Sequence, residues 1–209
     1  MEVKQNLDSN NNTMQSIGNI VDNLISNIED NLKIEDRPTF YIDEKPIRAA
    51  GILFYVKDKS NNKNMMLFRR ENKETTQFYC DTGGKTDVSD ESSIETAIRE
   101  TVEETNSHIF DKKHNRKKCT NILKNIFEKQ KIDYIYSPKS KYILYLVELR
   151  YSAYKKPLSR LGSYEKSLND ETKTHTYFWL DTIPIENLHP RLKVISKKIQ
   201  SFFNKIKCN

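Results

Sequence analysis

Three glutamates and an arginine in residues 99–104 have a spacing suited to metal chemistry. Glu100, Glu103 and Glu104 occupy positions i, i+3 and i+4, so on a helix their carboxylates lie on one side. These carboxylates repel one another by a few tenths of a kcal/mol per pair unless a cation lies among them. Ligation by oxygen alone favours Mg²⁺ or Mn²⁺. Arg99 can hold neighbouring carboxylates by bidentate hydrogen bonds. An exposed acidic helix without metal is the alternative for so short a pattern.

The residues around this pattern predict a helix that presents the carboxylates. Ser92 and Glu95 form a capping box, so the helix should begin at Ser93 and end at Asn106, which favours the left-handed conformation. One arc of this helix is suited to packing and holds Ile94, Ala97, Ile98, Thr101, Val102 and Thr105. The charged residues face the other side.

Two consecutive glycines precede this helix. Gly83 and Gly84 permit close backbone approach, so a carbonyl of Gly84 could join the metal shell. Together with Glu91, Arg99 and the three glutamates, Gly84 makes the segment resemble the box of the Nudix family.

The match has four departures. One more residue separates Gly84 from Glu91 than in the family's box, Thr101 replaces an apolar residue, Asn106 replaces a glycine and Ser107 is polar. The added residue falls in a loop, where length costs little, and asparagine is the next-best residue for the conformation that glycine adopts. All the charged positions of the helix are retained.

The resemblance implies metal-dependent hydrolysis of a diphosphate linkage in a nucleoside diphosphate derivative. It implies that Glu100, Glu103 and Glu104, with Gly84, bind Mg²⁺ or Mn²⁺. It also implies that Arg99 orients the carboxylates and that Glu91 braces Arg99. Glu100, Arg99 and Glu103 are therefore the predicted catalytic residues. Glu100 is one candidate for the general base, and the later loop offers others: Glu165, Asp170 and Glu171.

Other residues are candidates for substrate contacts. Arg69, Arg70 and Lys85 flank the expected cleft and could hold phosphates. Tyr55, Phe68 and Tyr142 could stack on a base, although strand alternation favours a place in the core for each.

Runs of apolar and β-branched residues predict strands on both sides of the box. The expected strands span residues 49–56, 64–70, 77–81, 132–136, 141–152 and 174–180, with a polar hairpin turn at residues 57–63. A basic insertion at residues 108–131 carries a short helix near Ile122, and residues 36–46 form a linker. This order predicts an α+β fold, and the resemblance implies an α/β/α sandwich with a mixed sheet.

Amphipathic helices are expected at both ends of the chain. The first carries apolar residues from Met14 to Leu32, so residues 1–36 are expected to form a flexible start and a helix, and residues 37–209 the Nudix-like domain. The last begins at Pro190, and its exposed face is basic. Its apolar stripe comprises Leu188, Leu192, Ile195, Ile199, Phe202 and Ile206.

The composition favours a folded protein with an anionic partner. The 209 residues have a formal net charge of +6, 36% hydrophobic residues and three cysteines without metal-ligand spacing. No run is apolar enough to cross a membrane, so we expect a cytoplasmic protein.

The substrate class stays open at this level. Nucleotide sugars, dinucleotides and nucleoside triphosphates compete with capped RNA, which the basic insertion and tail favour. The alternative function is a catalytically silent Nudix-fold module that binds nucleotide or RNA, and the intact box carboxylates argue against it. A scaffold role for the first helix could coexist with activity.

Overall fold

The computed structural model describes residues 37–73, 76–110, 113, 115–155, 158, 161 and 175–206. The chain divides into two units, and the description below concerns the second, Pro38–Asn209. The expected helix between Met14 and Leu32 lies outside the described residues, as does Cys208. Cys80 and Cys119 are buried and free of disulfides. No helix in the described ranges is both long and apolar enough to span a membrane.

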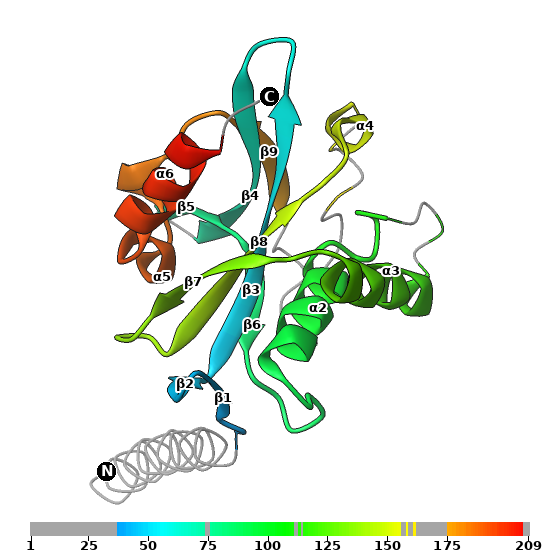
Figure 1. The fold of residues 1–209 in the computed structure, drawn as a ribbon, viewed down its shortest axis with the longest axis vertical. Helices are drawn as coiled ribbons and strands as arrows, with labels where there is room; N and C mark the ends of the chain where they lie inside the picture. The colour runs from blue at the N-terminus through cyan, green and yellow to red at the C-terminus, as the bar shows by residue number, and fades with distance from the viewer. Residues whose placement is uncertain are drawn as a thin grey trace, which may run out of the picture. The chain divides into compact units, whose positions relative to one another are not determined.

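A mixed β-sheet forms the centre of the fold (Figure 1). Its strands are β3 (Ala49–Asp58), β4 (Lys63–Lys73), β5 (Thr76–Cys80), β6 (Thr82–Lys85), β7 (Asp133–Ser137), β8 (Tyr142–Glu148) and β9 (Thr176–Leu180). β3 and β8 run parallel, and the other pairs are antiparallel.

The pairing register shows that the sheet splits beside β3. β8 occupies one edge of β3 from Ala49 to Tyr55, so β6 and β4 must share the other edge in succession. β6 pairs with the first half of β3 and β4 with the second half. β9 pairs with the other edge of β4. Residues of β4 that pair with β9 also pair with β3 or with β5, so β3 and β5 must share the opposite edge of β4 in succession. Asp81, between β5 and β6, therefore lies where β3 and β4 diverge.

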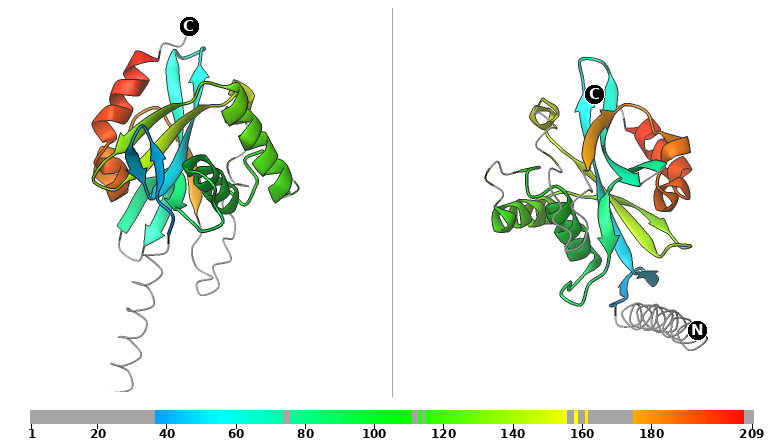
Figure 2. Two further views of the ribbon diagram at one scale, coloured as in Figure 1. Left: turned by 60° about the horizontal axis from the view of Figure 1, so that its bottom comes forward. Right: turned by 180° about the vertical axis from the view of Figure 1, so that it is seen from behind.

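Helices cover both faces of this sheet (Figure 2). Alternate side chains of β3 point to opposite faces, because the side-chain period of a strand is two. Ile52 and Phe54 belong to the core beneath α2 (Ser93–Glu104) and α3 (Arg116–Lys129). Leu53 and Tyr55 belong to the core beneath α5 (Pro190–Lys193) and α6 (Ser196–Lys205). The predicted α+β sandwich with a mixed sheet is confirmed.

Several local features differ from those expected from the sequence. The expected linker contains a hairpin of β1 (Phe40–Ile42) and β2 (Lys45–Ile47). The two glycines lie in strand β6, which pairs with β3, although glycine by itself does not favour a strand. The helix of the basic insertion, α3, has 14 residues. The closing helix is interrupted at Val194 and Ile195, although its predicted apolar residues do pack in the core.

Two smaller elements complete the described part. The residues after β8, expected to continue the strand, form the short helix α4 (Tyr151–Tyr154), and η2 (Ile185–Asn187) is a single 3₁₀ turn before α5.

Candidate active site

Helix α2 begins at Ser93 with the N-cap that its sequence predicts, and it ends at Glu104, two residues before the predicted Asn106. Ser92 is the N-cap, and its side chain accepts a hydrogen bond from the Glu95 N–H at 3.2 Å. The Glu95 carboxylate reaches back to the N–H of Glu91 at 3.0 Å. After the helix, Asn106 has a φ of 47°, the left-handed conformation that ends the helix.

The predicted inner face of α2 packs on the sheet. Ala97, Ile98 and Val102 are buried in the same core as Ile52 of β3. Thr101 is also buried, and its hydroxyl shares a hydrogen bond of 2.8 Å with the Thr82 hydroxyl of β6. This polar pair explains a threonine where the family's box has an apolar residue. It joins the helix directly to the strand of the two glycines.

Arg99 gathers three carboxylates beside this strand. Its Nε and Nη2 donate to the two oxygens of Asp90 at 2.9 and 3.1 Å. Its Nη1 donates to Glu100 at 2.9 Å and to Glu103 at 3.3 Å, and its Nη2 also bonds the Lys85 carbonyl at 2.9 Å. Burial lowers the pKa of Arg99, but Asp90 and Glu100 outweigh that effect, so the pKa lies above its usual value.

The prediction that Glu91 braces Arg99 is wrong, because Asp90 does so. The Asp90 side chain is only 3% exposed and also accepts hydrogen bonds from the Thr96 hydroxyl and the Asp87 N–H. Glu91 is exposed. The signal was present in the sequence, since the family's spacing after Gly84 leads to Asp90. The added residue therefore lies between this acid and Arg99.

Glu100 lies directly against Gly84. A Cβ atom at position 84 would overlap the Glu100 carboxyl group, so only glycine permits this approach. Burial raises the pKa of Glu100 above its usual value, while Arg99 opposes the shift. The helix thus presents a partly desolvated carboxylate to the backbone of β6.

Glu104 turns inward to a buried ion pair. One of its oxygens lies 2.8 Å from Nη2 of Arg69, and the other accepts the Gly83 N–H at 2.9 Å. Both charged side chains are 7% exposed. Burial raises the pKa of Glu104 to about 8, against the opposing charges of Arg69 and Arg191. Glu104 therefore ties the end of α2 to both β4 and β6.

A second buried ion pair holds the same strand from the other face of the sheet. Arg191 of α5 bonds one oxygen of Asp81 through Nε at 3.1 Å and Nη2 at 3.0 Å, and the Tyr142 hydroxyl bonds the other oxygen. The Asp81 side chain is fully buried. A Cβ atom at Gly51 would overlap both Asp81 and Tyr142. The role of Asp81 could not be predicted from the sequence, because its partner Arg191 is 110 residues away.

The donor set fits a divalent ion of the Mg²⁺ type. Glu100 and Glu103 approach the same nitrogen of Arg99, and Glu103 is 39% exposed. In the described ranges, no three His, Cys, Asp or Glu side chains converge on a ready-made metal site. Mg²⁺ commonly uses only one or two carboxylates and completes its shell with water and substrate oxygens. The pair formed by Glu100 and Glu103 meets that requirement.

The other candidate residues have different environments. Lys85 is exposed beside Gly84, and Arg70 places its guanidinium over the ring of Phe178 at 4.8 Å. Tyr55, Phe68 and Tyr142 are buried in the core beneath α5 and α6, as strand alternation favoured. The candidate bases Glu165, Asp170 and Glu171 lie outside the described residues.

Comparison with known proteins finds structural likenesses of low similarity. No protein-family model matches the sequence, and no curated protein matches it. A crystal structure of a C. elegans Ap4A hydrolase binary complex is 17% identical, with a TM-score of 0.42, covering 76% of this chain and 100% of that chain. A crystal structure of C. elegans Ap4A hydrolase is 18% identical, with a TM-score of 0.40, covering 75% and 97%. These identities and TM-scores are too low to indicate a function for this chain.

Proposed function

We propose that this protein hydrolyses a diphosphate linkage in a nucleoside diphosphate derivative, using Mg²⁺ or Mn²⁺. The observation that carries the proposal is the gathering of Asp90, Glu100 and Glu103 around Arg99, with Glu100 packed on Gly84. A solvated acidic helix has no need to hold a carboxylate against a glycine strand. The arrangement instead suits a fixed site for a cation and phosphate.

Each side chain has a separate task in this proposal. Glu100, Glu103 and the Gly84 carbonyl hold the cation, and Glu104 supports them by fixing Gly83. When bound, the cation neutralises charge on the diphosphate oxygens and makes water a better nucleophile. Arg99 holds Glu100 and Glu103 side by side. Lys85, exposed beside Gly84, is placed to approach a substrate phosphate.

Glu100 is also the candidate base among the described residues. Its carboxyl group lies against Gly84, close to the proposed cation. Burial raises its pKa when no cation is bound, and a bound cation would oppose that shift. In this role Glu100 accepts the proton that the attacking water releases. Glu165, Asp170 and Glu171 are the other candidates, and single glutamine or asparagine variants compare them by activity.

The test is hydrolysis of a substrate panel with Mg²⁺ or Mn²⁺. The panel contains dinucleotides, nucleotide sugars, nucleoside triphosphates and cap-labelled RNA, each with wild-type protein and Glu103→Gln. Glu128→Gln, an exposed glutamate of α3, is the matched control. We expect metal-dependent cleavage of at least one substrate, lost in Glu103→Gln and kept in Glu128→Gln.

A catalytically silent binding module is the second candidate. The full set of charged box residues favours an enzyme over this function. Nucleotide or RNA binding without cleavage of any substrate in the panel, with either metal, would overturn the hydrolase proposal.

A further inference from the structure

Two hollows lie along α3, and no residue of α2 is among their described lining. The first has a volume of about 360 Å³ and is lined by Asn115, Lys117, Lys118, Asn121, Ile122 and Asn125. The second has a volume of about 410 Å³, and Ile122 and Asn125 also line it. The two hollows therefore adjoin at Ile122 and Asn125, and we call them together the α3 groove.

The first hollow is basic and polar. Lys117 and Lys118 are exposed, as is their neighbour Arg116, and the first turn of α3 contains no acidic residue. Lysine and asparagine side chains are donors that commonly contact phosphate and sugar oxygens. The charge of this hollow is complementary to a polyanion.

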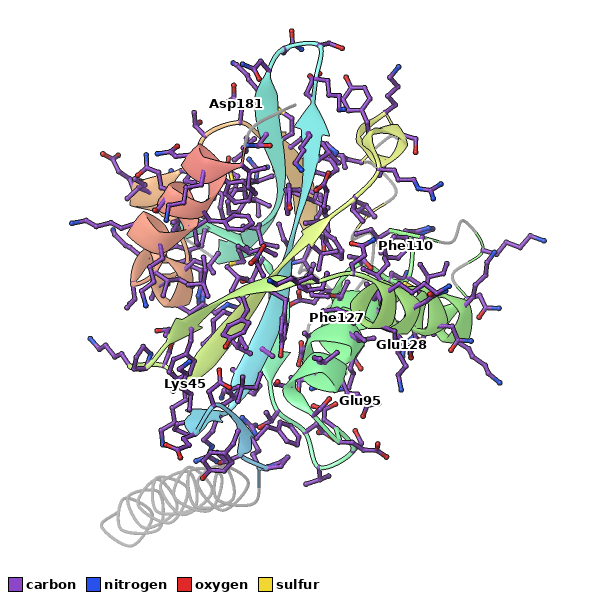
Figure 3. The ribbon with its side chains drawn as sticks, in the orientation of Figure 1. Lys45, Glu95, Phe110, Phe127, Glu128 and Asp181 are labelled. Atoms are coloured by element: carbon purple, nitrogen blue, oxygen red, sulfur yellow. The ribbon has the colours of Figure 1, made fainter. Side chains whose placement is uncertain are left out.

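The second hollow is mainly apolar, and its lining includes Phe110, Ile126, Leu149 and Ala153. Its charged lining residues are Lys129, Arg150 and Glu148, and the Glu148 carboxylate is paired with Lys57. Figure 3 shows Phe110 on the side of α3 that faces α4. A mainly apolar hollow of this size with a few polar groups is typical of small-molecule sites. A nucleobase has the matching chemistry, with apolar faces and polar edges.

The α3 groove is attached to the helix of the proposed active site. Leu123 and Cys119 of α3 are buried in the same core as Ile98 and Val102 of α2. Between the exposed sides of these helices, Lys124 Nζ lies 2.6 Å from a Glu95 carboxylate oxygen. A strand bound along α3 therefore runs beside the catalytic helix.

We propose that the α3 groove binds single-stranded RNA, with a base in the apolar hollow and the adjoining phosphates over Lys117 and Lys118. This inference deepens the proposed function, because it makes RNA with a 5′-diphosphate linkage the substrate class. Lys117 and Lys118 lie outside the carboxylate site, where a polymer substrate has further phosphates to contact and a small nucleotide has few or none. That RNA is the substrate rests on the proposed function. RNA binding in the groove does not, because binding can be measured without turnover.

The first experiment measures binding without turnover. A fluorescent single-stranded oligoribonucleotide is titrated with full-length protein in EDTA, and anisotropy is followed over a range of salt concentrations. We expect Lys117→Gln/Lys118→Gln to bind several-fold more weakly. For this double variant, the slope of log K against log salt concentration should be shallower by about 1.4, because each of the two lost phosphate contacts to a single strand removes about 0.7.

Matched variants separate a local effect from total charge. Lys59→Gln/Lys139→Gln changes the same charge at exposed positions of the β3–β4 and β7–β8 turns, and it should bind as the wild type does. Asn125 lines both hollows, so Asn125→Glu should weaken binding and Asn125→Lys should strengthen it. Equal losses in the α3 double variant and this turn double variant, or no loss in either, would overturn the proposal.

A competitor tests the apolar hollow. Inorganic polyphosphate carries the phosphates without a base, so it should displace the oligonucleotide much less well than unlabelled RNA of equal charge. Equal displacement by both competitors would show that the groove recognises charge alone, which contradicts a base in the second hollow.

Hydrolysis assays then distinguish this inference from the proposed function. Lys117→Gln/Lys118→Gln should raise KM for capped RNA and leave dinucleotide cleavage unchanged. Equal KM values for capped RNA would overturn the RNA groove while leaving the hydrolase intact. RNA binding that depends on Lys117 and Lys118, without any cleavage by wild-type protein, would refute the hydrolase and support the groove.

Discussion

Neighbouring glutamates of one helix have different environments in this protein. Glu103 is 39% exposed and bonds Arg99, whereas Glu104 is 7% exposed and bonds Arg69 and Gly83. Successive helical residues point about 100° apart, so one faces solvent while the next meets the sheet. In the proposed function, this difference gives cation binding to Glu103 and support of the glycine strand to Glu104.

Glu103→Gln should therefore separate activity from stability. Loss of a proposed metal ligand should cost more than the roughly 10–100-fold that follows loss of a supporting contact. As Glu103 is partly exposed, the free energy of unfolding should change by no more than about 0.5 kcal/mol. Steady-state kinetics with Mg²⁺ and urea denaturation in EDTA measure the two quantities. A large fall in stability would contradict the assigned role.

Glu104 should give the protein a pH-dependent stability. Its pKa is raised from 4.5 to about 8 by burial, so between these pH values the folded protein keeps a proton that the unfolded chain releases. Glu104 then meets Arg69 as a neutral carboxyl group, and the two side chains form an ion pair only at higher pH. Because the unfolded state then binds fewer protons, the free energy of unfolding should fall as pH rises from about 4.5 towards about 8. Glu104→Gln removes this contribution.

Urea denaturation in EDTA between these pH values measures the effect. The wild type should lose more stability across the range than Glu104→Gln does, and the difference should level off above pH 8. Parallel pH profiles for the two proteins would show that Glu104 has the same pKa in the folded and unfolded states.

At the scale of elements, the turn before α2 holds the helix in place. Asp90 is bonded by Thr96 of the helix, by Asp87 of the turn and by Arg99. The Arg99 guanidinium also reaches the Lys85 carbonyl at the end of β6. The turn, the strand and the helix thus share one arginine, and its orientation depends on all three.

Asp90→Asn should lower kcat by roughly 10–100-fold, the range for loss of a contact that orients a ligand. Arg99 would lose its main charged partner and hold Glu100 and Glu103 less firmly. Glu91→Gln is the matched control, since Glu91 is exposed and the two acids are adjacent. Steady-state kinetics on the cleaved substrate should show no change for Glu91→Gln. A larger loss in Glu91→Gln than in Asp90→Asn would refute this assignment.

At the scale of the whole domain, both sheet faces contribute to the site. Glu104 and Arg69 hold β6 from the side of α2. Arg191 of α5 holds Asp81, the residue just before β6, from the other side. The β5–β6 connection crosses the sheet where β3 and β4 diverge. The C-terminal helices are therefore coupled to the glycine strand through one buried ion pair.

Arg191→Leu should destabilise the domain by about 3–5 kcal/mol, because it leaves the buried Asp81 carboxylate without its cation. Asp81→Asn should also destabilise it. The double variant should lose less than the sum of the single losses, with a coupling of about 0.5–3 kcal/mol. Urea denaturation of the wild type, the two single variants and the double variant gives this coupling free energy. Additive losses would show that the two side chains do not act as a pair.

The local features of the site were determined by the sequence alone. The caps of α2, its buried face, the left-handed Asn106 and the neighbouring positions of Glu100 and Glu103 follow from spacing over a few residues, which helical geometry converts directly into position. The prediction that Glu104 lies on the same side is wrong, because its carboxylate turns to Arg69 and Gly83. The α+β order of elements followed in the same way from hydrophobic periodicity.

Only the tertiary structure decided which partners these residues meet. The choice of Asp90 over Glu91 depends on how the turn packs, and strand β6 exists because β3 offers it an edge. The pairs Arg69–Glu104 and Asp81–Arg191 join residues far apart in the chain. Local propensity carries no information on such contacts, because the split of the sheet, not the spacing of residues, brings these charges together.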